Sequence, residues 1–165
     1  MKSTEKQFLE AYDAHSEAIY RHCYFRVFSK ERAEELVQDT FRKAWQYLSE
    51  GKDVKNIRAL LYRIATNLII DDSRKRKEES LEGMLENDAT REPGDRGHLD
   101  MENKVLWKQV LAEMSTLDED ERALLVMRFV DDLDPKEIAE VLETNANNIS
   151  VKISRAVKKL KIKIQ

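Results

Sequence analysis

Residues 137–161 have the sequence EIAEVLETNANNISVKISRAVKKLK, in which two amphipathic segments flank a short polar turn. Apolar residues recur at helical spacing in both segments, and the stripe continues to Ile164, so the pattern predicts two helices. No acidic residue follows Glu143, whereas six cations do: Lys152, Arg155, Lys158, Lys159, Lys161 and Lys163. A helix-turn-helix inserts its second helix into the major groove between phosphates. The cations of a C-terminal helix can also serve only to compensate the helix end and to aid solubility. The paired helices favour DNA binding over this alternative.

The helical pattern extends upstream of this pair. Asp134 followed by Pro135 is typical of an N-cap residue with proline at the first helical position. Asp118, with Glu121 three residues later, has the pattern of a capping box. A further apolar stripe precedes them. We therefore expect residues 104–165 to form one helical domain.

The first half of the chain also has helical periodicity. Two patterns cover Thr4–Phe28 and Lys30–Leu48, and a third, the most apolar, follows Asn56, which we expect to be its N-cap. Periodicity leaves open whether the first pattern is one helix or two. We expect residues 1–78 to form a second helical domain.

The periodicity fades between these domains. Residues 79–104 hold eight acidic residues and three basic ones. A segment of this composition buries too little apolar surface to fold alone, which predicts a flexible acidic linker over residues 79–103. Only four glycines and two prolines occur in 165 residues, which also favours helices. The expected fold class is all-α, with two small helical domains joined by the linker.

The composition argues against several classes of protein. A net charge of −3 does not fit a non-specific polyanion binder. Cys23 is the single cysteine, and no apolar run has the length of a signal peptide or a membrane span, so we expect a cytoplasmic protein. His15, His22 and Cys23 are poor metal ligands as a group, because neighbouring residues point to different helix faces. With no nucleophile elbow or glycine-rich phosphate loop, we expect no enzyme, metal, cofactor or small-molecule substrate.

A second basic cluster, Arg74–Lys77, lies at the end of the most apolar helix. Taken alone, such a run is often a solvated helix end favoured by the helix dipole. Here two arginines, an amide and the aromatic Tyr62 precede it on the same helix, and such groups can hold a phosphate backbone and an unstacked base. We therefore favour nucleic-acid binding for this helix as well.

Four segments together resemble a bacterial RNA polymerase sigma factor of the sigma-70 superfamily. They are AEELVQDTFRKAWQYL (33–48), NIRALLYRIATNLIIDDSRKRK (56–77), LDEDERALLVMRFVDDLDPKEIAEVL (117–142) and NNISVKISRAVKKLK (147–161). The length and the two-domain organisation are similar to the extracytoplasmic-function (ECF) group. The resemblance implies a protein that binds core RNA polymerase, recognises the −10 and −35 promoter elements and promotes transcription initiation.

The resemblance also implies roles for particular residues. The helix that docks on the β′ coiled coil of core RNA polymerase would present Glu35, Gln38, Asp39, Phe41 and Arg42. Recognition and melting of the −10 element would use Arg58, Tyr62, Arg63, Asn67, Asp71, Arg74, Lys75, Arg76 and Lys77, and the loop 49–55 would capture a flipped base. Recognition of the −35 element would use Asn148, Ser150, Val151, Lys152, Ser154, Arg155, Lys158 and Lys159. The other implied partners are the polymerase β flap, promoter DNA and an anti-sigma factor, which would hold the chain at the inner membrane if it is anchored there.

The sequence departs from the family pattern at two places. Glu143 stands where these turns usually have glycine, and a left-handed backbone strains a residue with a Cβ atom, so we expect a turn reshaped around Asn145 or Asn147. Ser150 and Val151 occupy recognition positions that are often cationic or polar. Contacts with the −35 element are therefore expected to depend on the neighbouring cations and on phosphates.

An alternative is a helix-turn-helix transcriptional regulator that acts without docking on polymerase, with the N-terminal block used for dimerisation or sensing. Such a protein would bind palindromic half-sites as a symmetric dimer. The basic and aromatic helix within residues 56–77 would be superfluous in it. This helix therefore favours the sigma factor.

Overall fold

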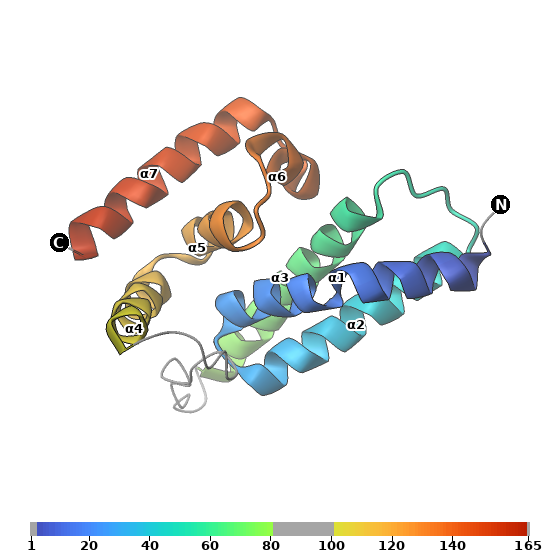
Figure 1. Ribbon diagram of the computed structural model, residues 1–165, viewed down its shortest axis with the longest axis horizontal. Coiled ribbons are helices and arrows are strands. Elements are labelled where there is room, and N and C mark those ends of the chain that lie inside the picture. The colour runs from blue at the N-terminus through green and yellow to red at the C-terminus, as the bar shows by residue number, and fades with distance from the viewer. Residues whose placement is uncertain (1–2, 81–100, 165) are drawn as a thin grey trace.

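The computed structural model describes residues 3–80 and 101–164, and every element within these ranges is helical (Figure 1). The predicted linker thus lies largely outside the described residues, as does the side chain of Lys77. None of the described helices is long and apolar enough to cross a membrane. The helices are α1 (Thr4–Val27), α2 (Lys30–Ser49), α3 (Ile57–Ser80), α4 (Met101–Thr116), α5 (Glu119–Leu125), the π-helical segment η2 (Val126–Val130), α6 (Pro135–Leu142) and α7 (Ala146–Ile164). The expected all-α class is confirmed.

Helices α1, α2 and α3 form the N-terminal domain. The sequence left open whether the first pattern is one helix or two, and α1 is a single helix whose N-terminus is capped by Ser3. The expected cap of α3 is confirmed, because the Asn56 side chain accepts a hydrogen bond from the backbone N–H of Ala59 at 3.1 Å. Apolar faces of the three helices meet in one core that includes Ile19, Cys23, Leu36, Phe41, Ala44, Leu61, Ala65 and Ile69.

Helices α4 to α7 form the C-terminal domain. Both predicted N-caps are confirmed: Asp118 accepts from the Glu121 N–H at 2.8 Å, and Asp134 accepts from the Glu137 N–H at 2.9 Å. The capping box expected at Asp118 is not confirmed, because the Glu121 carboxylate pairs with Lys159 at 2.9 Å. Glu137 also accepts from the Asp134 N–H at 3.2 Å, which completes a capping box at the start of α6. The buried stripe of this domain includes Leu111, Met114, Leu124, Ile138, Ala139, Ile149, Ile153 and Ala156.

The Asp118 cap should make stability depend on pH. The Glu121 N–H, which donates to this carboxylate, lowers the pKa of Asp118 in the folded protein. The stabilisation is therefore present above the pKa of the unfolded chain, about 3.9, and is lost as the pH falls through the lower folded pKa. We expect Asp118→Ala to lower the free energy of unfolding by about 1 kcal/mol at pH 7. Urea titrations from pH 7 to pH 3 measure this. The difference should shrink at the acid end, whereas Asp118→Asn, which caps without titrating, should stay close to wild type at pH 7.

The turn between α6 and α7 is not reshaped, so that expectation was wrong. Glu143 itself adopts the left-handed conformation, with φ 57° and ψ 48°, and the Thr144 N–H bonds to the Ala139 carbonyl at 2.9 Å. Asn145 then caps α7 by accepting from the Asn148 N–H at 2.8 Å. The hydrogen bonds at both helix ends hold Glu143 in the conformation that glycine usually supplies.

Glycine at position 143 should relieve this strain. The left-handed conformation costs a residue with a Cβ atom about 1–2 kcal/mol, and glycine removes this cost. Glycine also gives the unfolded chain more conformational freedom, which cancels part of the gain. Glu143→Gly should therefore stabilise the protein by about 0.5–1 kcal/mol. Denaturant unfolding measures the change. Glu140→Gly, at an exposed position inside α6, is the matched control and should destabilise by about 0.5–1 kcal/mol. A loss of stability in Glu143→Gly would contradict the strain argument.

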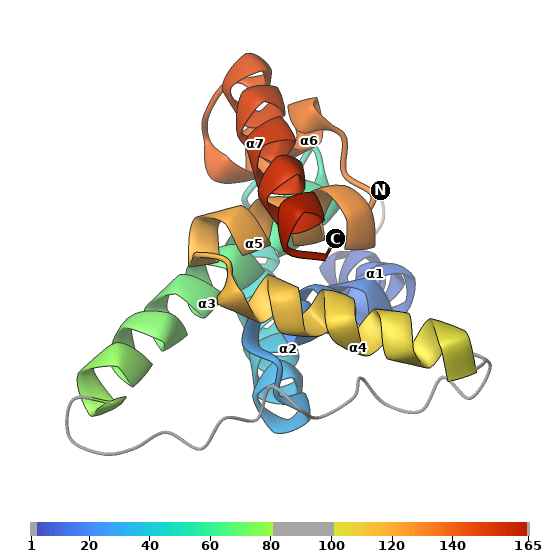
Figure 2. The same cartoon turned by 90° about the vertical axis from the view of Figure 1, so that its left-hand side faces the viewer.

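The two domains pack against each other. Helix α3 lies against α6, and α1 lies against η2 and α5. Helix α7 lies on the outer side of the C-terminal domain, away from α1 and α2 (Figures 1 and 2). We call the contact of α1 and α3 with α5, η2 and α6 the domain interface.

Candidate nucleic-acid and polymerase interfaces

A buried pair of polar side chains lies at the centre of the domain interface. His22 on α1 has Nδ1 2.6 Å from the Asp131 carboxylate, which follows η2, and both side chains are at most 1% exposed. The Tyr62 ring lies edge-on to the imidazole, with 5.3 Å between centroids. A buried carboxylate is stabilised only when it has a hydrogen-bond donor. The contact with His22 therefore favours the arrangement in which the two domains are packed together.

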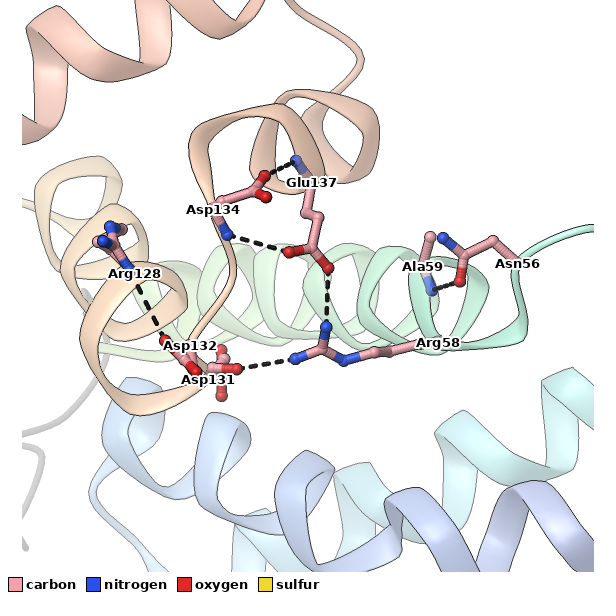
Figure 3. Close-up of polar contacts among 8 residues, drawn as sticks. All are labelled: Asn56, Arg58, Ala59, Arg128, Asp131, Asp132, Asp134 and Glu137. Atoms are coloured by element: carbon pink, nitrogen blue, oxygen red, sulfur yellow. Dashed lines mark hydrogen bonds and ion pairs between the residues drawn. The ribbon is translucent and has the colours of Figure 1, made fainter.

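Arg58 links α3 to the start of the helix-turn-helix (Figure 3). Its guanidinium lies 2.7 Å from the Glu137 carboxylate and donates to the Asp131 carbonyl at 3.0 Å. Glu137 is the same residue that completes the capping box with Asp134. One arginine of the predicted −10 surface therefore holds the N-terminus of α6.

Arg63, five residues after Arg58 on α3, contacts the other end of α6. It donates to the Glu140 carbonyl at 3.0 Å, and its Nε lies 3.8 Å from the Glu143 carboxylate. The last carbonyls of a helix attract cations because they carry partial negative charge. Both arginines thus serve the domain interface in this arrangement.

The predicted −10 surface is divided into a covered and an open part. Tyr62 is 1% exposed, and burial raises the pKa of its phenol, so no base can stack on it while the domains are packed. Arg58 and Arg63 are half-buried under α6, and Arg76, further along α3, is half-buried beside Asp72. The open part faces solvent and consists of Asn67, Asp71, Arg74 and Lys75.

The predicted −35 surface is open along its whole length. All eight residues are exposed on one face of α7, and the opposite face is buried by Ile149, Ile153 and Ala156. Lys159 is within 2.9 Å of the Glu121 carboxylate, which raises the pKa of its ammonium group. The exposed residues are Asn148, Ser150, Val151, Lys152, Ser154, Arg155, Lys158 and Lys159.

The predicted polymerase-docking residues lie along α2. Glu35, Gln38 and Arg42 are exposed, and Asp39 is half-exposed and pairs with Arg42 at 2.9 Å. Phe41 differs from the others because it is 4% exposed and packs edge-on against Tyr12 at 4.9 Å between centroids. Its side chain supports the helix from the core side and leaves the polar residues to form the outer face.

Comparison with known families assigns both domains. Residues 11–79 match the family model described as Sigma-70 region 2, and residues 107–160 match that of Sigma-70, region 4. The chain belongs to the sigma-70 family. These two matches cover α1 to α3 and nearly all of α4 to α7 in this sigma factor.

Curated relatives are ECF RNA polymerase sigma factors. BldN of Streptomyces coelicolor is 32% identical over 157 residues, which cover 90% of this chain and 57% of BldN. SigW of Bacillus subtilis is 25% identical over 173 aligned positions, which cover 93% of this chain and 87% of SigW. The chain thus spans just over half of the first relative and most of the second. Both relatives agree with the ECF group that the sequence indicated.

A solved structure has the same fold. It is the sigma factor RpoE of Bartonella quintana in complex with the anti-sigma factor NepR, and it superposes with a TM-score of 0.79 at 22% identity. The match covers 96% of this sigma factor and 97% of RpoE.

Several residues of the domain interface were not predicted from the sequence of this sigma factor. His22 was considered only as a metal ligand, and the described residues contain no group of three or more side chains that could hold a metal ion. Asp131 lies just after η2, and Glu137 lies in the first turn of α6. Their partners are 109 and 79 residues away in the chain, so no local pattern marks these contacts.

Proposed function

We propose that this protein is an ECF-type sigma factor that binds core RNA polymerase, recognises the −10 and −35 promoter elements and promotes transcription initiation. The observation that carries the proposal is the presence of both sigma-70 regions in one chain, one with an exposed polar face on α2 and the other with an exposed cationic face on α7. This function needs no catalysis by the chain itself, because phosphate contacts position the domains and base contacts specify the site.

The proposed partners follow from these surfaces. Helix α2 would dock on the β′ coiled coil, the C-terminal domain would meet the β flap, and α3 and α7 would bind promoter DNA. An anti-sigma factor is a further proposed partner, since the structural relative RpoE was solved with one. We place the protein in the cytoplasm with its polymerase, at the inner membrane surface where the anti-sigma factor is membrane-anchored.

Promoter binding requires the domains to separate. By their names the two elements lie about 25 base pairs apart, or about 85 Å of duplex at 3.4 Å per base pair. In the packed arrangement α3 contacts α6 directly, and Arg58 and Arg63 are bonded to the C-terminal domain. The packed form is therefore a form of the sigma factor that is not bound to a promoter.

In vitro transcription tests the proposal. Purified bacterial core polymerase is incubated with a fragment library from the source genome, with and without this chain. We expect chain-dependent transcripts that share two upstream elements. Absence of such transcripts, together with failure of the chain to co-elute with core polymerase, would refute the function and favour a regulator that acts without polymerase.

A further inference from the structure

A cavity of about 440 Å³ lies at the domain interface, within the size range of small-molecule sites. Its walls come from the corner between α1 and α2, from α3 and from the start of α5. The two domains therefore share it. Four arginines line the cavity: Arg26, Arg32, Arg76 and Arg122.

Arg26 is the least satisfied of these groups. The residue is 5% exposed, and its Nε and Nη1 atoms have no hydrogen-bond acceptor among the residues that the structure describes. Burial lowers the pKa of its guanidinium to about 10, partly offset by Glu119, so the group remains a cation at neutral pH. Buried donors without an acceptor are unfavourable, so a ligand that brings acceptors to these two nitrogen atoms would be favoured here.

The other arginines are held in place by the protein. The Arg122 guanidinium stacks on the Phe28 ring at 5.3 Å and donates to four backbone carbonyls. Arg32 and Arg76 both pair with the carboxylate of Asp72 at the edge of the cavity. The four carbonyls that accept from Arg122 are those of Met114, Ser115, Leu117 and Arg26.

The charges around the cavity favour an anion. Asp118 and Glu119 also line it, so the four arginines leave a formal charge of +2, which Asp72 at the edge reduces to +1. Glu119 is occupied in part by the Ser73 hydroxyl, which donates to it at 3.0 Å. Apart from Ser73, the rest of the wall is apolar and consists of Val27, Phe28 and Ile69. An anionic group joined to a less polar body would match both parts of the wall.

We propose that this cavity binds a small phosphorylated ligand whose phosphate accepts hydrogen bonds from Arg26. The fork of guanidinium donors matches phosphate oxygens, and the apolar wall would contact the organic part of the ligand. Because both domains line the cavity, such a ligand stabilises their packed arrangement. If the protein has the proposed function, the ligand would also oppose promoter binding. Only this consequence rests on the proposed function.

Thermal unfolding of the full chain tests binding without polymerase. The probes are inorganic phosphate, AMP and GMP, with adenosine and sulfate at the same ionic strength as controls. We expect a saturable rise in Tm of about 5 °C with the phosphate probes, larger for the nucleotides than for inorganic phosphate. Adenosine should give no rise. If only inorganic phosphate raises Tm, the cavity binds phosphate, but the proposed contact between the apolar wall and the organic part of the ligand is wrong. A rise no larger than that with sulfate for every probe would overturn the proposal.

Three variants locate the effect. Arg26→Met replaces the buried cation, whose Nε and Nη1 atoms lack acceptors, by an apolar chain of similar length, so it should abolish the rise without lowering Tm in chloride. Arg76 is half-buried at the cavity edge, and Arg76→Ala should reduce the rise in Tm. This variant tests the site if Arg26→Met does not fold. Arg21→Met on α1, outside the cavity and paired on the surface with Glu17, is the matched control and should keep the full rise. A wild-type rise in both cavity variants would overturn the assignment.

Discussion

Asp131→Ala should separate the two domains. The substitution leaves His22 buried without its carboxylate partner, and breaking a buried polar pair in this way costs about 3–5 kcal/mol. Buried apolar residues of both domains join in one hydrophobic cluster, but the helices of each domain also pack extensively on one another. We therefore expect the loss to fall mainly on the contact between the domains and not on either helical fold. Small-angle X-ray scattering should then report a larger radius of gyration, while the circular dichroism of the helices stays close to wild type.

Two comparisons make this prediction specific. Asp132→Asn changes the neighbouring carboxylate, whose side chain is 95% exposed and pairs with Arg128 at 3.8 Å, and it should cost less than about 0.5 kcal/mol. Asparagine also tolerates the left-handed φ of 55° at that position. If Asp131→Ala has the dimensions of wild type, the His22–Asp131 contact does not hold the domains together.

Separation should also uncover part of the predicted −10 surface. Arg58 loses its hydrogen bond to the Asp131 carbonyl when that segment moves away, and Tyr62 packs against the imidazole of His22, which loses its Asp131 partner. Hydrogen exchange at the start of α3 should therefore become faster in Asp131→Ala. Protection as strong as in wild type would mean that the N-terminal domain alone buries this segment.

The helices and most of their ends were predictable because their causes are local. Three of the caps accept from a backbone N–H only three residues later in the chain, so a short stretch of sequence contains the whole interaction. These caps are Asn56, Asp118 and Asp134. The exposed face of α7 was predictable for the same reason, since its apolar stripe leaves one side for solvent. Periodicity did not predict η2, because a π-helical segment departs from the spacing of 3.6 residues on which such predictions depend.

The domain interface was not predictable because its contacts join distant parts of the chain. Tyr62 illustrates the difference: its position on an arginine-rich helix suggested an exposed base-stacking ring, but in the packed arrangement it lies beside His22. Glu143 illustrates another limit. Its residue type argued against a left-handed turn, yet the hydrogen bonds of α6 and the Asn145 cap of α7 impose one. In both cases tertiary contacts outweigh the local preference of the residue.

The double variant Lys152→Ala/Arg155→Ala should lose most transcription from a promoter that needs its −35 element. Both side chains are exposed on α7, three residues apart and therefore on one face of the helix. A direct base or phosphate contact contributes about 1–3 kcal/mol, so the loss of two should reduce chain-dependent transcripts roughly 100-fold. Because neither residue is in the core, the free energy of unfolding should change by less than about 0.5 kcal/mol.

The salt dependence of binding separates this loss from a general defect. Each phosphate contact removed lowers the slope of log affinity against log salt by about 1, so holoenzyme with the double variant should show a slope smaller by up to about 2. Lys161→Ala, an exposed cation further along α7, is the matched control and should change transcription less than about threefold. Co-elution with core polymerase should be unchanged in both variants, because the proposed docking face lies on α2. If the double variant transcribes like wild type, Lys152 and Arg155 do not make the −35 contacts. The contacts would then be assigned to the more C-terminal cations Lys158 and Lys159.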